Sequence, residues 1–233
     1  MSKQLSRRGF LKSAGLGMAV AAAEPAIASA ASVPEPRPRM AMAPGQALQL
    51  LIAGNRRWVT GTVTHPHQSV GRREALRHVQ HPFATIVSRI DSRVPPELVF
   101  DRGIGDMAVI RTGAQVLDDG VVLGSVEFSC DHLHTPLVPI MGHQRCGAVE
   151  AAIRVIQSGS TAPGPYSVGR RRPSPGIRRG GQAAGRPGRQ HGESADDTRV
   201  RRLRTDPLIH ELIAHGKLVV RGAYYSLGTG VCR

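Results

Sequence analysis

The chain has few aromatic residues, few cysteines and no long apolar run, and each shortage excludes a class of protein. Aromatic side chains make up 3% of its 233 residues, too few for a surface that stacks the bases of single-stranded nucleic acid. Its three cysteines cannot form a disulfide scaffold. No stretch of roughly 18 consecutive apolar residues occurs, so the sequence predicts no membrane-spanning helix. The length favours one domain with appendages.

Positive charge is plentiful but unevenly spread. The formal net charge is +14, from 31 Lys and Arg against 17 Asp and Glu. Residues 163–192 contribute seven arginines and no acidic side chain, and residues 1–30 are also basic. The rest of the chain is only mildly basic, so the total charge is a poor argument for a nucleic-acid partner.

The amino terminus has the layout of an export signal. Arg7 and Arg8 precede Phe-Leu-Lys, a short apolar run and a small-residue Ala-Ser-Ala site. The paired arginines resemble the twin-arginine signal of bacteria, which predicts a signal peptide over 1–30 and a periplasmic location. Residues 31–43 are rich in proline and are interpreted as a linker. The alternative interpretation is a frayed, mildly amphipathic helix.

From residue 44 onward, short apolar runs alternate with segments that have helical patterning. This alternation predicts an α/β fold with a mostly parallel central sheet flanked by helices, in one domain over 44–233. The expected strands are 83–87, 107–110, 137–141 and 217–225, and the expected helices are 44–60, 95–100, 121–132, 148–157 and 207–215.

One long stretch has a composition that cannot cover a hydrophobic core. Arg, Gly and Pro supply 20 of the 30 residues in 163–192. We therefore expect 163–200 to be disordered and to interrupt the domain. The alternative is a basic segment that binds RNA or another anion, although Tyr166 is its only aromatic residue.

Side chains capable of metal and acid–base chemistry follow two of the predicted strands. His143 and Cys146 follow the third strand, and at this spacing both can face one zinc ion, which prefers nitrogen and thiolate ligands. A buried structural cysteine beside a capping histidine explains the same spacing equally well. Asp91 and Arg93 follow the first strand, and open parallel sheets place their sites at the carboxyl ends of strands.

Three motifs occur in a fixed order around these residues. They are Asp-Ser-Arg-Val-Pro-Pro-Glu at 91–97, Phe-Asp-Arg-Gly-Ile-Gly-Asp at 100–106 and Gly-His-Gln-Arg-Cys-Gly-Ala-Val at 142–149. In order and spacing they resemble the β class of carbonic anhydrases. Gly-Asn-Arg-Arg-Trp at 54–58 and the closing segment 225–230 also resemble that family.

The resemblance implies a zinc-dependent lyase that reversibly hydrates carbon dioxide to bicarbonate. In that family two cysteines and one histidine hold zinc, which lowers the pKa of its bound water so that hydroxide attacks near neutral pH. By resemblance, His143 and Cys146 are zinc ligands, and Asp91 takes the fourth ligand position when no water does. Arg93 would hold the Asp91 carboxylate away from the metal. The expected assembly is a homodimer or a multiple of dimers, with no nucleic-acid partner.

The chain departs from the family at the first zinc position. The family has a cysteine two residues before the aspartate, and this chain has Arg89. Two unit charges about 4 Å apart interact by roughly 4 kcal/mol at an effective dielectric constant of about 20, and a divalent ion roughly doubles that. We therefore expect a loss of zinc affinity on the order of a hundredfold or more.

Other departures lie outside the motifs. Pro139 falls in a predicted central strand, where it removes a hydrogen-bond donor. Residues 165–200 replace a helix-forming stretch of the family, and we hypothesise a compensated frameshift there. The sequence leaves two alternative functions open: a catalytically inactive remnant, and a basic anion- or RNA-binding protein acting through 163–192. Cys130 is expected to be buried and Cys232 to lie in a frayed terminus.

Overall fold

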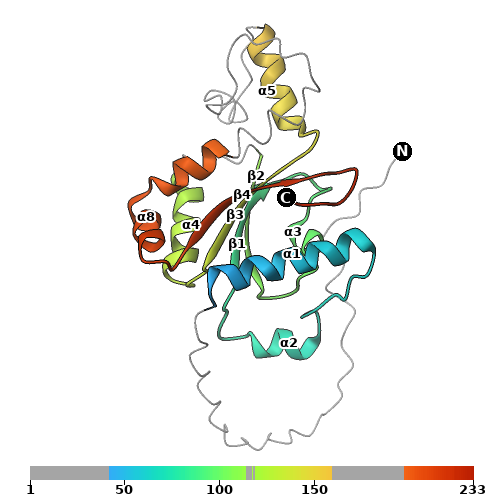
Figure 1. Ribbon diagram of the computed structural model, residues 1–233, viewed down its shortest axis with the longest axis vertical. Helices are drawn as coiled ribbons and strands as arrows, with labels where there is room; N and C mark the ends of the chain where they lie inside the picture. The colour runs from blue at the N-terminus through green and yellow to red at the C-terminus, as the bar shows by residue number, and fades with distance from the viewer. Residues whose placement is uncertain (1–41, 114–116, 118, 159–196) are drawn as a thin grey trace, which may run out of the picture. The chain divides into compact units, whose positions relative to one another are not determined.

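A parallel sheet forms the centre of the domain. The computed structural model describes residues 42–113, 117, 119–158 and 197–233, so the predicted signal peptide and almost all of the predicted linker and disordered segment lie outside the described residues (Figure 1). The strands lie in the order β2-β1-β3-β4, and every pair of neighbours is parallel. This confirms the predicted α/β fold. The strands are β1 (Ala84–Arg89), β2 (Met107–Thr112), β3 (Leu137–His143) and β4 (Val219–Tyr225).

Helices connect and cover these strands. They are α1 (Pro44–Thr60), α2 (Val70–Ala75), α3 (Pro96–Val99), α4 (Gly120–Asp131), α5 (Gly147–Ser158) and α8 (Pro207–Ala214). In the described part of the chain, no helix is long and apolar enough to cross a membrane.

Local sequence explains where α1 begins and ends. Pro44 occupies the first turn, where its missing N–H costs no hydrogen bond. The Gln46 side chain accepts a hydrogen bond from the Ala43 N–H at 3.2 Å. Gly61 ends the helix with a φ of 69°, a left-handed conformation that glycine adopts without a steric penalty.

The sheet carries a hydrophobic core on each face because side chains alternate along its strands. In β1, Ile86 belongs to the core that includes Leu51 of α1, and the next residue, Val87, belongs to the opposite core. That second core includes Val126 of α4 and Ile209 of α8, which cover the other face (Figure 1). With both faces covered by apolar packing, the carboxyl ends of the strands are left to carry polar side chains.

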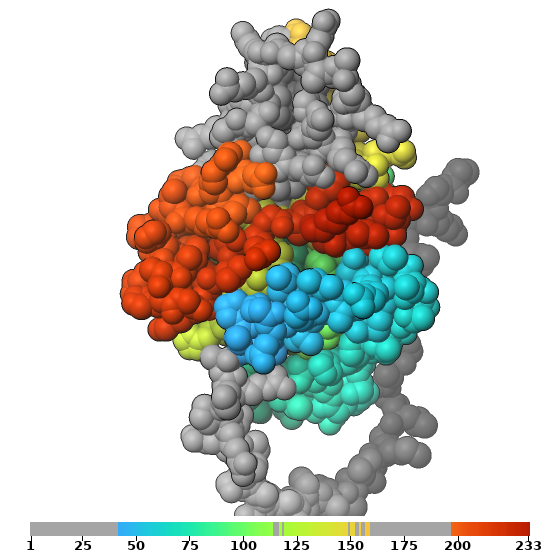
Figure 2. Space-filling model, in the orientation of Figure 1, coloured from blue at the N-terminus to red at the C-terminus, as the bar shows by residue number. Residues whose placement is uncertain are grey.

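The C-terminal segment after β4 is held against α1. The Asn55 side chain donates to the carbonyls of Val99 and Gly230 at 3.1 and 2.9 Å and accepts from the Cys232 N–H at 2.9 Å. The Trp58 indole N–H donates to the Tyr225 hydroxyl at 3.0 Å. The red C-terminal segment accordingly lies beside α1 in the space-filling view (Figure 2). The Gly-Asn-Arg-Arg-Trp motif thus contributes packing between distant segments.

The structure corrects several details predicted from sequence. Cys232 is half-buried, and its backbone pairs with Tyr225 in an isolated β-bridge, so it does not lie in a frayed terminus. Burial raises the pKa of its thiol to about 12. Residues 197–204 are helical, with Val200 buried, so the segment expected to be disordered cannot extend to residue 200. A buried apolar side chain every third or fourth residue is sufficient to anchor this short helix. The first strand also continues beyond residue 87, and its last residue is Arg89.

Pro139 lies in β3, an interior strand, as the sequence predicts. It aligns with Arg221 of β4, while β1 pairs with β3 at Val87 and Ile140. Proline supplies no N–H to either ladder. The β3 side chains are all buried, so packing on both faces offsets the missing donor.

Candidate active site

The carboxyl ends of β1 and β3 bring the predicted site residues together. β1 ends at Arg89 and leads into the loop with Asp91 and Arg93, while β3 ends at His143. The His143 Nε2 atom lies 3.7 Å from Asp91 Oδ2. Cys146 follows in the loop after β3 and is 7% exposed. The two clusters that are far apart in sequence therefore form one site.

Arg93 holds the Asp91 carboxylate with three hydrogen bonds. Its Nε donates to Oδ1 at 2.9 Å, its Nη2 donates to Oδ2 at 2.6 Å, and its backbone N–H donates to Oδ1 at 3.0 Å. The side-chain hydrogen bond from Arg93 holds the pKa of Asp91 well below its usual range, despite partial burial. Asp91 is therefore an ionised carboxylate in a fixed orientation, as the resemblance implied for this pair.

His143 presents one buried ring nitrogen to the site. Its Nδ1 lies 3.0 Å from the Gln144 carbonyl, which accepts a hydrogen bond only if Nδ1 carries the proton. In the neutral ring this leaves the lone pair on Nε2, the form in which histidine binds metals. Nε2 is buried and makes no hydrogen bond to any residue that the structure describes, and the side chain is 1% exposed. A buried nitrogen of this kind favours a ligand role.

The loops after β1 and β3 are tied to each other and to β4. Arg93 Nη2 donates to the Arg145 carbonyl at 3.3 Å, which links the two loops. The Gln144 N–H donates to the Tyr225 carbonyl at 2.9 Å. Arg145 has a φ of 51°, which lets the chain turn sharply between His143 and Cys146.

Arg89 lies where the resemblance places a second thiolate, and it is 3% exposed. In the described ranges, no group of three or more His, Cys, Asp or Glu residues is arranged to hold a metal ion. His143 and Cys146 supply two suitable donors, but the Asp91 carboxylate is engaged by Arg93. Cys130 is a residue of α4, and its side chain is buried in the core between α4 and the sheet. The donors present therefore do not complete the three-ligand zinc set that the resemblance implies.

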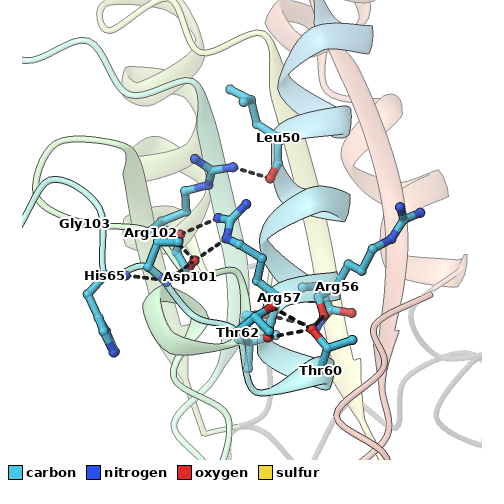
Figure 3. Close-up of polar contacts among 12 residues, drawn as sticks. Leu50, Arg56, Arg57, Thr60, Thr62, His65, Asp101, Arg102 and Gly103 are labelled. Atoms are coloured by element: carbon cyan, nitrogen blue, oxygen red, sulfur yellow. Dashed lines mark hydrogen bonds and ion pairs between the residues drawn. The ribbon is translucent and has the colours of Figure 1, made fainter.

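A second polar cluster joins α1 to the loop after α3, and sequence reasoning did not find its role. Asp101 accepts from Arg57 Nε at 2.5 Å, from the Thr64 N–H and hydroxyl, both at 3.1 Å, and from the His65 N–H at 3.0 Å (Figure 3). Although burial raises the pKa of Asp101, these hydrogen bonds lower it to about 2. Asp101 has a φ of 43°, which a single sequence does not reveal. Through these contacts the cluster organises the loop.

The histidines at 65 and 67 lie in an exposed loop. His67 Nδ1 lies 2.7 and 2.9 Å from the two carboxylate oxygens of Asp106. Arg111 near the end of β2 was not singled out from sequence, yet its guanidinium contacts the backbone of the Asp91 loop. The available signal was an arginine close to the carboxyl end of an apolar strand.

Comparison with known proteins identifies the family of this chain. The carbonic anhydrase family model matches residues 84–232. "Carbonic anhydrase 2" of Mycobacterium tuberculosis is 40% identical over 199 residues, which cover 80% of this chain and 90% of that protein. The carbonic anhydrase of Mycolicibacterium smegmatis is 41% identical over 121 residues, covering 52% of this chain and 58% of that protein.

Solved structures show the same fold at lower identity. A tetrameric β-carbonic anhydrase of Sordaria macrospora superposes with a TM-score of 0.54 at 20% identity, covering 81% of this chain and 96% of that chain. The β-carbonic anhydrase CafA of Aspergillus fumigatus gives a TM-score of 0.53 at 20% identity, covering 80% and 89%. The chain therefore belongs to the carbonic anhydrase family, in its β class.

Proposed function

We propose that this chain hydrates carbon dioxide reversibly to bicarbonate as a zinc-dependent enzyme, and that Arg89 lowers its affinity for zinc. The family supports carbon dioxide hydration in general. The observation that carries the proposal for this chain is the buried His143 Nε2, which lies 3.7 Å from an Asp91 carboxylate that Arg93 holds in place. A ligand nitrogen and an oriented carboxylate are two of the groups that such a site needs.

The residues of this chain have separate tasks in the proposed reaction. His143 and Cys146 offer a nitrogen and a sulfur ligand. Arg93 keeps Asp91 ionised and oriented, so that the carboxylate can accept a hydrogen bond from the attacking oxygen. Because the donor set is incomplete, the structure supports no step that runs through a bound metal.

Arg89 opposes cation binding in two ways. It removes one negatively charged thiolate from the set, and it adds a positive charge to a buried position, where solvent screens charges poorly. The same incomplete set favours a second candidate, a carbonic-anhydrase-like protein that folds without metal and does not catalyse the reaction.

The dependence of the hydration rate on free zinc separates the two candidates. We expect a low stopped-flow hydration rate that rises with added zinc over a wide concentration range, because a two-donor site binds weakly. The His143→Ala variant should not show this rise, since it loses the nitrogen ligand. If the unmodified chain does not hydrate carbon dioxide at any zinc concentration, the enzymatic proposal is refuted and the non-catalytic candidate remains. A full rate without added zinc would contradict weak binding.

We also propose export through the twin-arginine pathway and assembly into homodimers or multiples of dimers. The support for export is the Arg7-Arg8 pair and the sequence that follows it. Changing Arg7 and Arg8 together to lysine should keep the precursor in the cytoplasm, as measured by cell fractionation. Normal periplasmic recovery of that variant would refute the proposed export.

Light scattering tests the proposed assembly. A measured mass equal to that of a single chain would refute assembly into dimers.

A further inference from the structure

Arg111 joins the end of β2 to the loop that carries Asp91. Its Nε donates to the Arg89 carbonyl at 2.9 Å, and its Nη2 donates to the Asp91 carbonyl at 2.6 Å. Between these two acceptors, Ile90 adds a backbone contact: its N–H donates to the Thr112 carbonyl at 3.2 Å. The chain after β1 is thus fastened to β2 for two residues beyond the strand.

We propose that Arg111 is a positioning residue that fixes the backbone of the Asp91 loop, so that the Asp91 carboxylate faces His143. The Asp91 carbonyl also accepts from the Val94 N–H at 3.1 Å, which closes the turn. Arg93 then fixes the carboxylate itself. Arg111 acts through Asp91. Its effect on catalysis rests on the proposed function, whereas its contacts are observed independently of that function.

Arginine suits this task because its planar guanidinium presents several donors in a fixed fork. The carbonyl of Arg89, at the end of β1, and the carbonyl of Asp91, in the loop that follows, each receive one donor. A lysine ammonium is a point charge on a flexible stem and does not reproduce this geometry. Both acceptors are backbone atoms, so the contacts remain when the side chain at position 89 is changed.

Hydrogen exchange in the full chain tests the contact without any need for zinc. In Arg111→Gln, we expect the amides of Ile90 and Val94 to exchange about tenfold faster or more, because the loop opens locally. The matched control is Arg204→Gln, since Arg204 Nη2 also donates to a backbone carbonyl, that of Val220, at 2.7 Å. The control should leave exchange at Ile90 and Val94 unchanged. Unchanged exchange in Arg111→Gln would overturn the proposal, and so would equal acceleration over the whole sheet.

Kinetics in the Arg89→Cys background, with zinc loaded, test the catalytic meaning. Arg111→Gln should lower kcat on the order of a hundredfold with zinc content unchanged, because a shift of about 1 Å in a catalytic group has such an effect. Arg111→Lys should have a higher kcat than Arg111→Gln. If Arg111→Gln does not fold, Arg111→Lys takes its place in both experiments. An unchanged kcat despite a loosened loop would overturn the proposed catalytic meaning of Arg111. If Arg89→Cys itself is inactive, the proposed function fails, while hydrogen exchange still decides whether Arg111 holds the loop.

Discussion

Replacing Arg89 with cysteine is expected to raise both zinc occupancy and the rate of carbon dioxide hydration. The change restores a third donor beside His143 and Cys146 and removes a buried positive charge. If the cation and the metal lie about 4 Å apart at an effective dielectric constant of about 20, their repulsion amounts to a few kcal/mol, so we expect zinc affinity to rise on the order of a hundredfold or more. Zinc affinity is measured by competition with a chelator, and hydration by stopped flow at matched zinc.

Two further variants separate the causes of this effect. Arg89→Ala removes the cation without adding a thiolate, so it should give only part of the gain. Arg221→Cys adds a cysteine at an exposed position of β4 and should give none, which controls for adventitious binding by a thiol. If the unmodified chain already hydrates carbon dioxide at a rate that Arg89→Cys does not improve, the interpretation of Arg89 is wrong.

Replacing Asp101 with alanine is expected to give the largest loss of stability. The substitution leaves Arg57 without its ion-pair partner and leaves the N–H groups of Thr64 and His65 without an acceptor. Breaking a buried pair costs about 3–5 kcal/mol, and the lower end applies because the Arg57 side chain is 27% exposed. Urea unfolding measures the loss. Asp131→Ala, at an exposed position at the end of α4, is the control and should change stability little.

The dependence of stability on pH should also show the contribution of the Asp101 carboxylate. The hydrogen bonds to Asp101 lower its pKa from 3.8 to about 2, despite the opposing effect of burial. A lowered pKa in the folded state adds stability at pH values above the unfolded pKa, and this stability is lost as the pH falls toward 2. The contribution is about 2 kcal/mol. Between pH 6 and pH 2, Asp101→Asn should therefore lose less unfolding free energy than the unmodified chain, and an equal loss would contradict this assignment.

The parts of the fold that depend on local pattern were predictable from sequence. Apolar, β-branched runs predicted the parallel strands, and Pro44 predicted the start of α1. The site was predictable as far as it depends on the ends of strands, because β1 and β3 are parallel neighbours and place Asp91 beside His143. Sequence showed that both clusters follow strands, whereas the structure was needed to show that these two strands are neighbours.

Contacts between side chains and distant backbone atoms were not predictable in the same way. Arg111 reaches carbonyls 20 and 22 residues away, and Asn55 reaches Cys232 across 177 residues. Such contacts depend on loop conformation, including the positive φ of Asp101. Cys232 was expected to be frayed because of its terminal position, but hydrogen bonds with Asn55 of α1 hold that segment.

The zinc content of the purified protein shows whether Arg89 weakens zinc binding. Unmodified chain and Arg89→Cys are each incubated with excess zinc and desalted, and bound zinc per chain is measured by elemental analysis. We expect well under one equivalent for the unmodified chain and close to one for Arg89→Cys. One full equivalent in the unmodified chain that disappears in His143→Ala would show that this site binds zinc tightly with Arg89 in place, and would refute the proposed effect of Arg89.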